Sequence, residues 1–312
     1  MNNNLALTQR LGTAEVPFLA SCPSLSAIRY YLFRMIDNLL RRVLLLVLVL
    51  GSGRLALGQA VPYGHNPAAG HYQAVRGVRL YYEAYGAGPP LLLLHGNGDN
   101  LAAFAQNIAF WARHHRVIAV DSRAHGKSVD PGDSLSFEMM ADDMAGLLTQ
   151  LHLDSADVVG WSDGGITALV LALRHPAKVR RLVATGANLS PDSLALTPAL
   201  WRQQQKGYHE HKNTVFADPK RRNEWKVFLL DVFQPNVPLS ALRRIAAPAF
   251  IVAGDRDVIT LEHTVAIYRH LRRARLWVVP NSGHATLQEH ATEFNQQVEA
   301  FLAAKALPAL AH

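Results

Sequence analysis

Ser162 lies in a short glycine-rich segment that could turn its hydroxyl into a nucleophile. The segment reads Gly160-Trp161-Ser162-Asp163-Gly164; it follows an apolar run, 156–159, and precedes a helical pattern, 166–174. This order predicts a strand, a sharp turn and a helix, with the serine at the apex in a strained backbone conformation. Because five residues of this kind also occur by chance, the assignment depends on the other groups that such chemistry needs.

A serine needs a base that takes its proton and a third group that orients the base. His284 follows a glycine in a polar loop, and Asp257 follows the strand-like run 250–253. We therefore expect Ser162, Asp257 and His284 to act together. Asp255 is the alternative acid. His290 is the alternative base, although it lies inside a predicted helix that has no tight loop to aim the ring.

A parallel sheet is the element expected to position these groups, because strand-like and helix-like segments alternate along the chain. The expected strands are 91–94, 117–120, 156–159, 179–185, 250–253 and 275–279, after a β-hairpin over 72–85; the expected helices are 100–113, 137–151, 166–174, 261–272 and 287–304. Ligands bind at the carboxyl ends of parallel strands. His95, Asp121 and Ser162 all fall at such ends. We expect His95 and the nearby His125 to have local structural roles.

The alternation stops between about residues 188 and 240, which we call the cap segment. Two amphipathic helical patterns lie here, with polar residues between them and prolines after them. The segment carries too much apolar area to be left in water, as shown by Trp201, Tyr208, Phe216, Trp225, Phe228 and Phe233. We therefore expect a small helical cap over the strand ends, inserted in the main domain.

The chain from about 72 to 304 resembles the α/β-hydrolase superfamily of serine hydrolases. The resemblance rests on His95-Gly96, the Asp121 loop, the segment around Ser162, Gly254-x-x-Asp257 and Gly283-His284, in that order. It implies a mostly parallel, eight-stranded α/β sheet and the catalytic order serine, acid, histidine. The family places the acid three residues after the glycine, which favours Asp257 over Asp255.

An oxyanion hole requires two backbone donors aimed at the charge that develops on the substrate. The turn after the nucleophile predicts the amide of Asp163 as one donor. The resemblance implies the amide of Asn97, directly after His95-Gly96, as the other.

The run Gly160-Trp161-Ser162-Asp163-Gly164-Gly165 looks most like the biphenyl-hydrolase-like, or valacyclovir hydrolase, branch of the superfamily. Trp161, Asp163 and Trp201 are the expected substrate-binding side chains. A carboxylate beside the nucleophile would favour a cationic group on the substrate. An alternative is equally open: the charge of Asp163 would only stabilise the start of the following helix.

The N-terminal 60 residues differ in composition from the rest. They contain six arginines and two acidic residues, and so carry more than half of the net charge of +7. The basic excess in the rest of the chain is therefore small and does not indicate nucleic-acid binding. Arg41-Arg42, the apolar run 43–50 and Ala60 predict a signal peptide with translation starting at Met35. Residues 61–312 would then be an exported hydrolase domain. An uncleaved membrane anchor is the alternative.

The expected function is hydrolysis of a carboxylic ester, or a related acyl bond, of a small molecule through an acyl-enzyme. The alternatives on the same scaffold are a hydrolase of carbon–carbon bonds, a cofactor-free haloperoxidase and a non-catalytic ligand receptor. The one cysteine, Cys22, lies in the leader, and no histidine pair has the spacing of a zinc site, so we expect neither a metal nor an organic cofactor.

Overall fold

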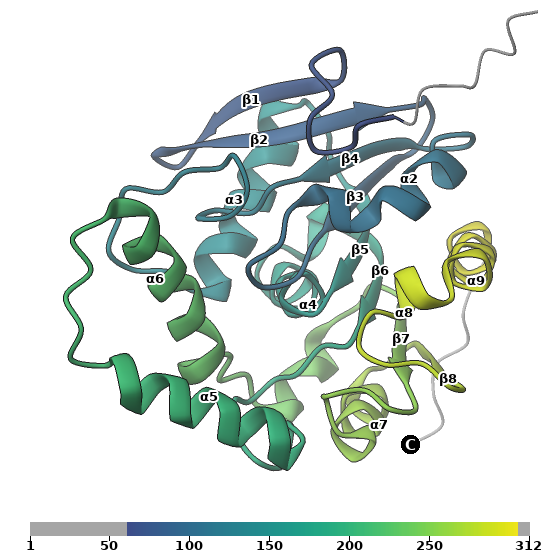
Figure 1. Ribbon diagram of the computed structural model, residues 1–312. Coiled ribbons are helices and arrows are strands. Elements are labelled where there is room, and N and C mark those ends of the chain that lie inside the picture. Colours follow the sequence, from purple (N-terminus) through teal and green to yellow (C-terminus); the bar gives the residue numbers. More distant parts are fainter. Residues whose placement is uncertain (1–60, 305–312) are drawn as a thin grey trace, which may run out of the picture. The chain divides into compact units, whose positions relative to one another are not determined.

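An eight-stranded, mostly parallel sheet forms the centre of the protein in the computed structural model, which describes residues 61–304 (Figure 1). The strand order is β1-β2-β4-β3-β5-β6-β7-β8, and all neighbours from β4 to β8 run parallel. The strands are β1 (Gly70–Val75), β2 (Val78–Tyr85), β3 (Pro90–Leu94), β4 (Arg116–Val120), β5 (Ala156–Trp161), β6 (Val179–Thr185), β7 (Ala249–Gly254) and β8 (Ala274–Val279). The expected fold class is confirmed.

The two antiparallel strands, β1 and β2, form the predicted hairpin at one edge of the sheet. Val75 pairs with Val78, so the turn consists of Arg76 and Gly77, both of which have positive φ angles, 45° and 83°. Such a turn matches the right-handed twist of paired strands. β2 then pairs with β4 and joins the hairpin to the parallel strands.

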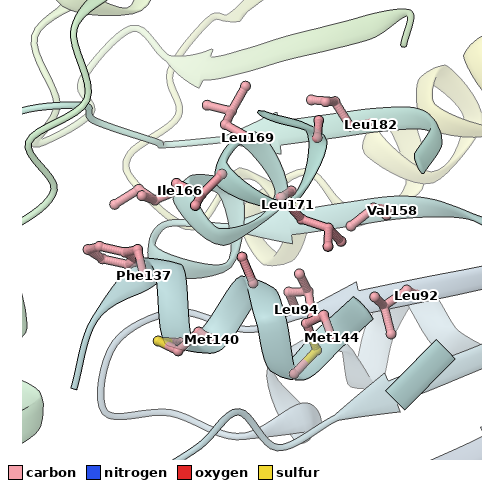
Figure 2. Packing of buried hydrophobic residues seen from close by; sticks show 14 of the residues in the cluster. Leu92, Leu94, Phe137, Met140, Met144, Val158, Ile166, Leu169, Leu171 and Leu182 are labelled. Carbon is pink, nitrogen blue, oxygen red and sulfur yellow. The ribbon is translucent and has the colours of Figure 1, made fainter. Parts of the chain in front are cut away.

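Consecutive apolar residues of the central strands point to opposite faces of the sheet, and each face has its own core. Leu92 and Leu94 of β3 belong to one core with α3 and α4, as Figure 2 shows, while Leu91 and Leu93 belong to the other. All four leucines are fully buried. A strand covered on both sides must be apolar throughout, which explains the short unbroken apolar runs in the sequence.

Helices cover both faces of this sheet. One core contains residues of α3 (Phe137–Gln150), α4 (Asp163–Arg174) and α7 (Leu261–His270); the other contains residues of α2 (Ala105–Trp111), α8 (Thr286–Glu289) and α9 (Ala291–Ala303). The predicted single helix over 287–304 is wrong, because the backbone breaks at His290 (φ −124°, ψ 40°) and divides it into α8 and α9. The helix expected from Asn100 begins instead as a 3₁₀ turn, Leu101–Phe104, capped by the Asn100 side chain.

The cap segment contains two helices between β6 and β7, α5 (Pro198–His211) and α6 (Pro219–Phe233), drawn as a pair beside the strands in Figure 1. Helix α6 makes buried polar contacts with the rest of the fold. Lys226 of α6 is buried, and its Nζ lies 2.7 Å from both Asp130 Oδ2 and the carbonyl oxygen of Gly132. Asp130 also contacts Arg123, which makes a two-point ion pair with Asp143. A buried charge network thus fastens α6 to the loop after β4.

Replacing Lys226 by methionine is expected to lower the free energy of unfolding by about 3 kcal/mol, because it removes one partner of a buried ion pair. Lys220→Met on the same helix is the matched control: this lysine is 84% exposed and lies 3.8 Å from Glu224, so its loss should cost about 0.5 kcal/mol or less. Urea unfolding of both variants measures the difference. Equal costs would show that the buried network does not hold α6.

The predicted leader, its cleavage site and the start at Met35 lie outside the described residues. Within residues 61–304, no helix combines the length and the apolar character that crossing a membrane requires.

Candidate active site

Ser162 occupies the turn between β5 and α4 with φ 55° and ψ −119°, a conformation that side-chain-bearing residues rarely adopt. Gly160 and Gly164 must be glycines, because backbone atoms of neighbouring segments lie where a Cβ would be. A Cβ on Gly160 would collide with the carbonyl oxygen of Gly164, and a Cβ on Gly164 would collide with that of Leu94. Strand β5, helix α4 and the end of β3 are therefore packed closely enough to force the serine onto a sharp apex.

His284 and Asp257 complete a chain of hydrogen bonds that starts at this serine. His284 Nε2 lies 2.9 Å from Ser162 Oγ, and His284 Nδ1 lies 2.7 Å from Asp257 Oδ1. The Asp257 side chain is 1% exposed, whereas that of His284 is 24% exposed. An ionised Asp257 accepts only, so it assigns the proton to Nδ1 and leaves Nε2 to accept from the serine hydroxyl. The loops after β7 and β8 thus bring together residues 122 positions apart.

The alternative acid and base lie elsewhere. Asp255 is exposed, and its Oδ1 accepts a hydrogen bond from the amide of Ser282, which fixes the loop that carries His284. His290 lies at the junction of α8 and α9, where its Nε2 is 3.4 Å from the carbonyl oxygen of Asn281. Neither side chain takes part in the hydrogen-bond chain from Ser162.

Trp161 holds the histidine loop from the side of the nucleophile. Its Nε1 donates to the carbonyl oxygen of His284 at 2.9 Å, and the two rings lie 5.8 Å apart. The same indole lines the cavity beside Ser162. Trp161 therefore contacts both the space for a substrate and the loop that carries the histidine.

The two expected oxyanion-hole residues lie together beside Ser162. Asn97 lines the cavity with Gly96, and its Nδ2 donates to Asp163 Oδ2 at 2.9 Å and to the carbonyl oxygen of Val227 in α6 at 3.0 Å. Within residues 61–304, the backbone amides of Asn97 and Asp163 have no acceptor. Asn97 thus links the nucleophile turn to the cap segment while its amide stays available.

The carboxylate of Asp163 does not line the cavity, contrary to the expectation that it binds substrate. Asp163 is 2% exposed, and a second carboxyl group, Asp231 of α6, lies against it and lines the cavity instead. Burial raises the pKa of Asp163, and burial together with the nearby charge of Asp163 raises the pKa of Asp231 well above its ordinary value. Of these two adjacent carboxyl groups Asp163 is buried and Asp231 is partly buried, and ionising both would place two like charges side by side. The sequence could not show that α6 covers Asp163.

The cavity at Ser162 has a volume of about 260 Å³. Its lining comes from the sheet edge, from the cap segment and from the loop after β7: Gly96, Asn97, Trp161, Ser162, Asn188, Leu196, Leu200, Gln204, Asp231, Val258, Ile259 and His284. Trp201 is not among them, so its expected contact with the substrate has no support from the cavity lining and stays a prediction. In α5 the lining residues are Leu200 and Gln204, four positions apart on one face, and Trp201 is turned about 100° from Leu200 around the helix.

His95 and His125 are buried next to the nucleophile turn, with ring centroids 5.1 Å apart. His95 Nδ1 lies 2.7 Å from the carbonyl oxygen of Gly96, and its Nε2 accepts from the amide of Ser122 at 3.0 Å. His125 Nδ1 lies 2.8 Å from the carbonyl oxygen of Arg123. Burial lowers the pKa of each ring to about 4, so both are neutral in the folded protein near pH 7. As expected from the sequence, these histidines hold loops.

The free energy of unfolding is expected to fall as the pH drops from about 6.5 to 4. In that window the histidines of the unfolded chain bind protons while His95 and His125 remain neutral, so acid favours unfolding by up to about 1.4 kcal/mol per pH unit for each ring. The free energy of unfolding of His125→Phe should therefore change less with pH than that of the wild type. His114→Phe, at an exposed histidine, is the control. Urea unfolding at several pH values tests this, and equal slopes for both variants would contradict it.

Comparison with known proteins gives consistent matches. A family model described as the alpha/beta hydrolase fold matches residues 89–224. The 2-hydroxymuconate semialdehyde hydrolase of Pseudomonas sp. strain CF600 is 30% identical over 77% of this chain and 95% of its own. The human serine hydrolase BPHL is 29% identical over 80% of this chain and 95% of its own.

A likeness in fold extends to solved structures. The carboxylesterase CesB of Bacillus subtilis superposes with a TM-score of 0.61 over 75% of this chain and 91% of its own, at 21% identity. The family match, the two relatives and the sheet order agree with one another. The chain therefore belongs to the α/β-hydrolase family.

Proposed function

We propose that this hydrolase is a serine hydrolase that cleaves a carboxylic ester, or a related acyl bond, of a small molecule. The observation that carries the proposal is the chain of hydrogen bonds from Ser162 Oγ through His284 to Asp257, at 2.9 and 2.7 Å. Both distances lie within the reach that proton transfer requires. The serine also borders a cavity large enough for a small substrate.

In the proposed mechanism, Ser162 Oγ attacks the carbonyl carbon while His284 Nε2 takes the hydroxyl proton. Asp257 stabilises the positive charge on the imidazole and keeps its orientation. The amides of Asn97 and Asp163 donate to the oxyanion, and each such donor is worth roughly 3–4 kcal/mol of the barrier. His284 then gives the proton to the leaving alcohol. A water molecule, activated by the same histidine, hydrolyses the acyl-enzyme.

A second function, hydrolysis of a carbon–carbon bond, has support from the relative that is 30% identical, which is named as a 2-hydroxymuconate semialdehyde hydrolase. The human relative named as a serine hydrolase and the fold shared with a carboxylesterase support ester cleavage. Hydrolysis of simple aryl esters and of 2-hydroxymuconate semialdehyde by the same preparation should be compared by kcat/KM. A higher value for the semialdehyde would favour the second function.

Labelling with a fluorophosphonate probe tests the nucleophile directly. The probe should modify Ser162, as peptide mass mapping would show, and prior incubation with an ester substrate should slow the labelling. A non-catalytic ligand receptor would bind small molecules in the cavity without reacting. Lack of labelling in folded protein would therefore overturn the proposed function.

We also propose that residues 61–312 are exported. The support is the arginine pair followed by the apolar run 43–50 in the N-terminal leader. N-terminal sequencing of the protein from a bacterial host should find Val61, or a residue near it, at the start. An intact Met1 on protein in the cytoplasm would contradict export.

A further inference from the structure

The cavity at Ser162 has a second polar region, and it comes from the cap segment. Gln204 of α5 and Asp231 of α6 both line the cavity, although neither belongs to the hydrogen-bond chain of Ser162. The other lining residues of the cap segment and of the loop after β7 are Asn188, whose Nδ2 donates to the carbonyl oxygen of Ser190, and four aliphatic residues: Leu196, Leu200, Val258 and Ile259. Two polar side chains in such a wall are positioned to act on a bound molecule.

Of these two side chains, Gln204 says more about the chemistry of a ligand. It is 7% exposed, and it is the only residue of α5 that is buried; the other residues of this helix are partly or fully exposed. Its Oε1 is fully buried and has no hydrogen-bond partner among residues 61–304. A buried amide oxygen without a hydrogen-bond donor is unfavourable, because it has lost its hydrogen bonds to water. A ligand that donates a hydrogen bond to it would recover that energy, whereas an aliphatic ligand would not.

We propose that Gln204 is a specificity-determining residue that accepts a hydrogen bond from a hydroxyl group on the substrate, away from the bond that is cleaved. Gln204 Oε1 is an unpaired acceptor in the wall of this cavity, so a donor group on the ligand is the matching chemistry. The aliphatic lining would contact the carbon chain between that hydroxyl and the scissile carbonyl. The inference deepens the proposed function and rests on it. The preferred substrates are therefore hydroxylated esters rather than esters with plain alkyl ends.

The test compares pairs of esters that differ in one group. Ethyl esters of straight-chain acids ending in a hydroxyl or a methyl group form one series, and acetate esters of diols and of matching alkanols form the other. Titration of the released acid gives kcat/KM. We expect the hydroxylated ester to be preferred by about 10- to 100-fold at the best chain length. The two series show whether the hydroxyl belongs to the acyl or the alcohol part.

Gln204→Leu should abolish this preference, so that the hydroxylated and the alkyl ester of each pair are cleaved with nearly equal kcat/KM. Gln203→Leu, at the exposed glutamine beside it on the same helix, should retain the preference. Fluorophosphonate labelling of Ser162 checks the catalytic serine separately in every variant. Labelling without a hydroxyl preference in the wild type, or equal preferences in the Gln204→Leu and Gln203→Leu variants, would overturn this inference and leave the proposed function standing.

Discussion

Replacing Ser162 by alanine is expected to lower kcat for ester hydrolysis roughly 10⁶-fold. Among residues 61–304, Ser162 Oγ is the one oxygen that hydrogen-bonds with His284 Nε2, and the variant lacks it, so no acyl-enzyme forms. Hydrolysis would then rely on the remaining binding and oxyanion groups, which typically leave about 10³- to 10⁴-fold over the reaction in water. Steady-state kinetics with an activated aryl ester, and the loss of fluorophosphonate labelling, measure the effect.

Ser122→Ala is the matched control for this prediction. Ser122 is a buried serine in the loop after β4, at the same edge of the sheet, and its hydroxyl has no partner among the described residues. Its loss should change kcat by less than about threefold. If Ser162→Ala kept more than a tenth of the activity, or if Ser122→Ala lost as much, Ser162 would not be the nucleophile.

The substitution Asp257→Asn is expected to lower kcat by about 10⁴-fold. Asp257 Oδ1 lies 2.7 Å from His284 Nδ1 and also accepts from the amide of Ile259 at 3.0 Å. An amide in its place is neutral and can donate to Nδ1, which would put the proton on Nε2, where it blocks removal of the proton from Ser162. The loss should appear mainly in kcat, because Asp257 does not line the cavity.

Asp255→Asn is the control, because it makes the same chemical change two residues away at the rival acid. Asp255 is exposed and bonded to the loop at Ser282, so its variant should keep kcat within a few-fold and lose only some stability. A large loss in Asp255→Asn with a small one in Asp257→Asn would exchange the roles of the two acids. Circular dichroism of both variants separates a catalytic defect from misfolding.

The two losses should not add. Ser162 and Asp257 act in one hydrogen-bond chain, so the double variant should be about as inactive as Ser162→Ala alone. A further large loss in the double variant would mean that Asp257 also acts through another group.

Residue patterns were enough to predict the sheet and the groups at its edge. Short runs such as Leu91–Leu94 are apolar at every position because both faces of a central strand are buried, so they can be recognised without coordinates. Parallel strands bring their carboxyl ends to one edge. Asp257 and His284 follow β7 and β8 and Ser162 follows β5, so chain order predicts that they lie at one edge of the sheet. The choice of Asp257 over Asp255 came from the family resemblance.

Which side chains line the cavity depends on contacts between segments that are distant in the sequence. The rotation of α5 places Leu200 and Gln204 in the cavity and turns Trp201 away, and the packing of α6 sets Asp231 against Asp163. Helical periodicity shows which residues share a face, but the direction of that face depends on the crossing of helices distant in sequence. Local residue patterns do not specify those contacts, so the residues that line the cavity cannot be identified without the folded structure.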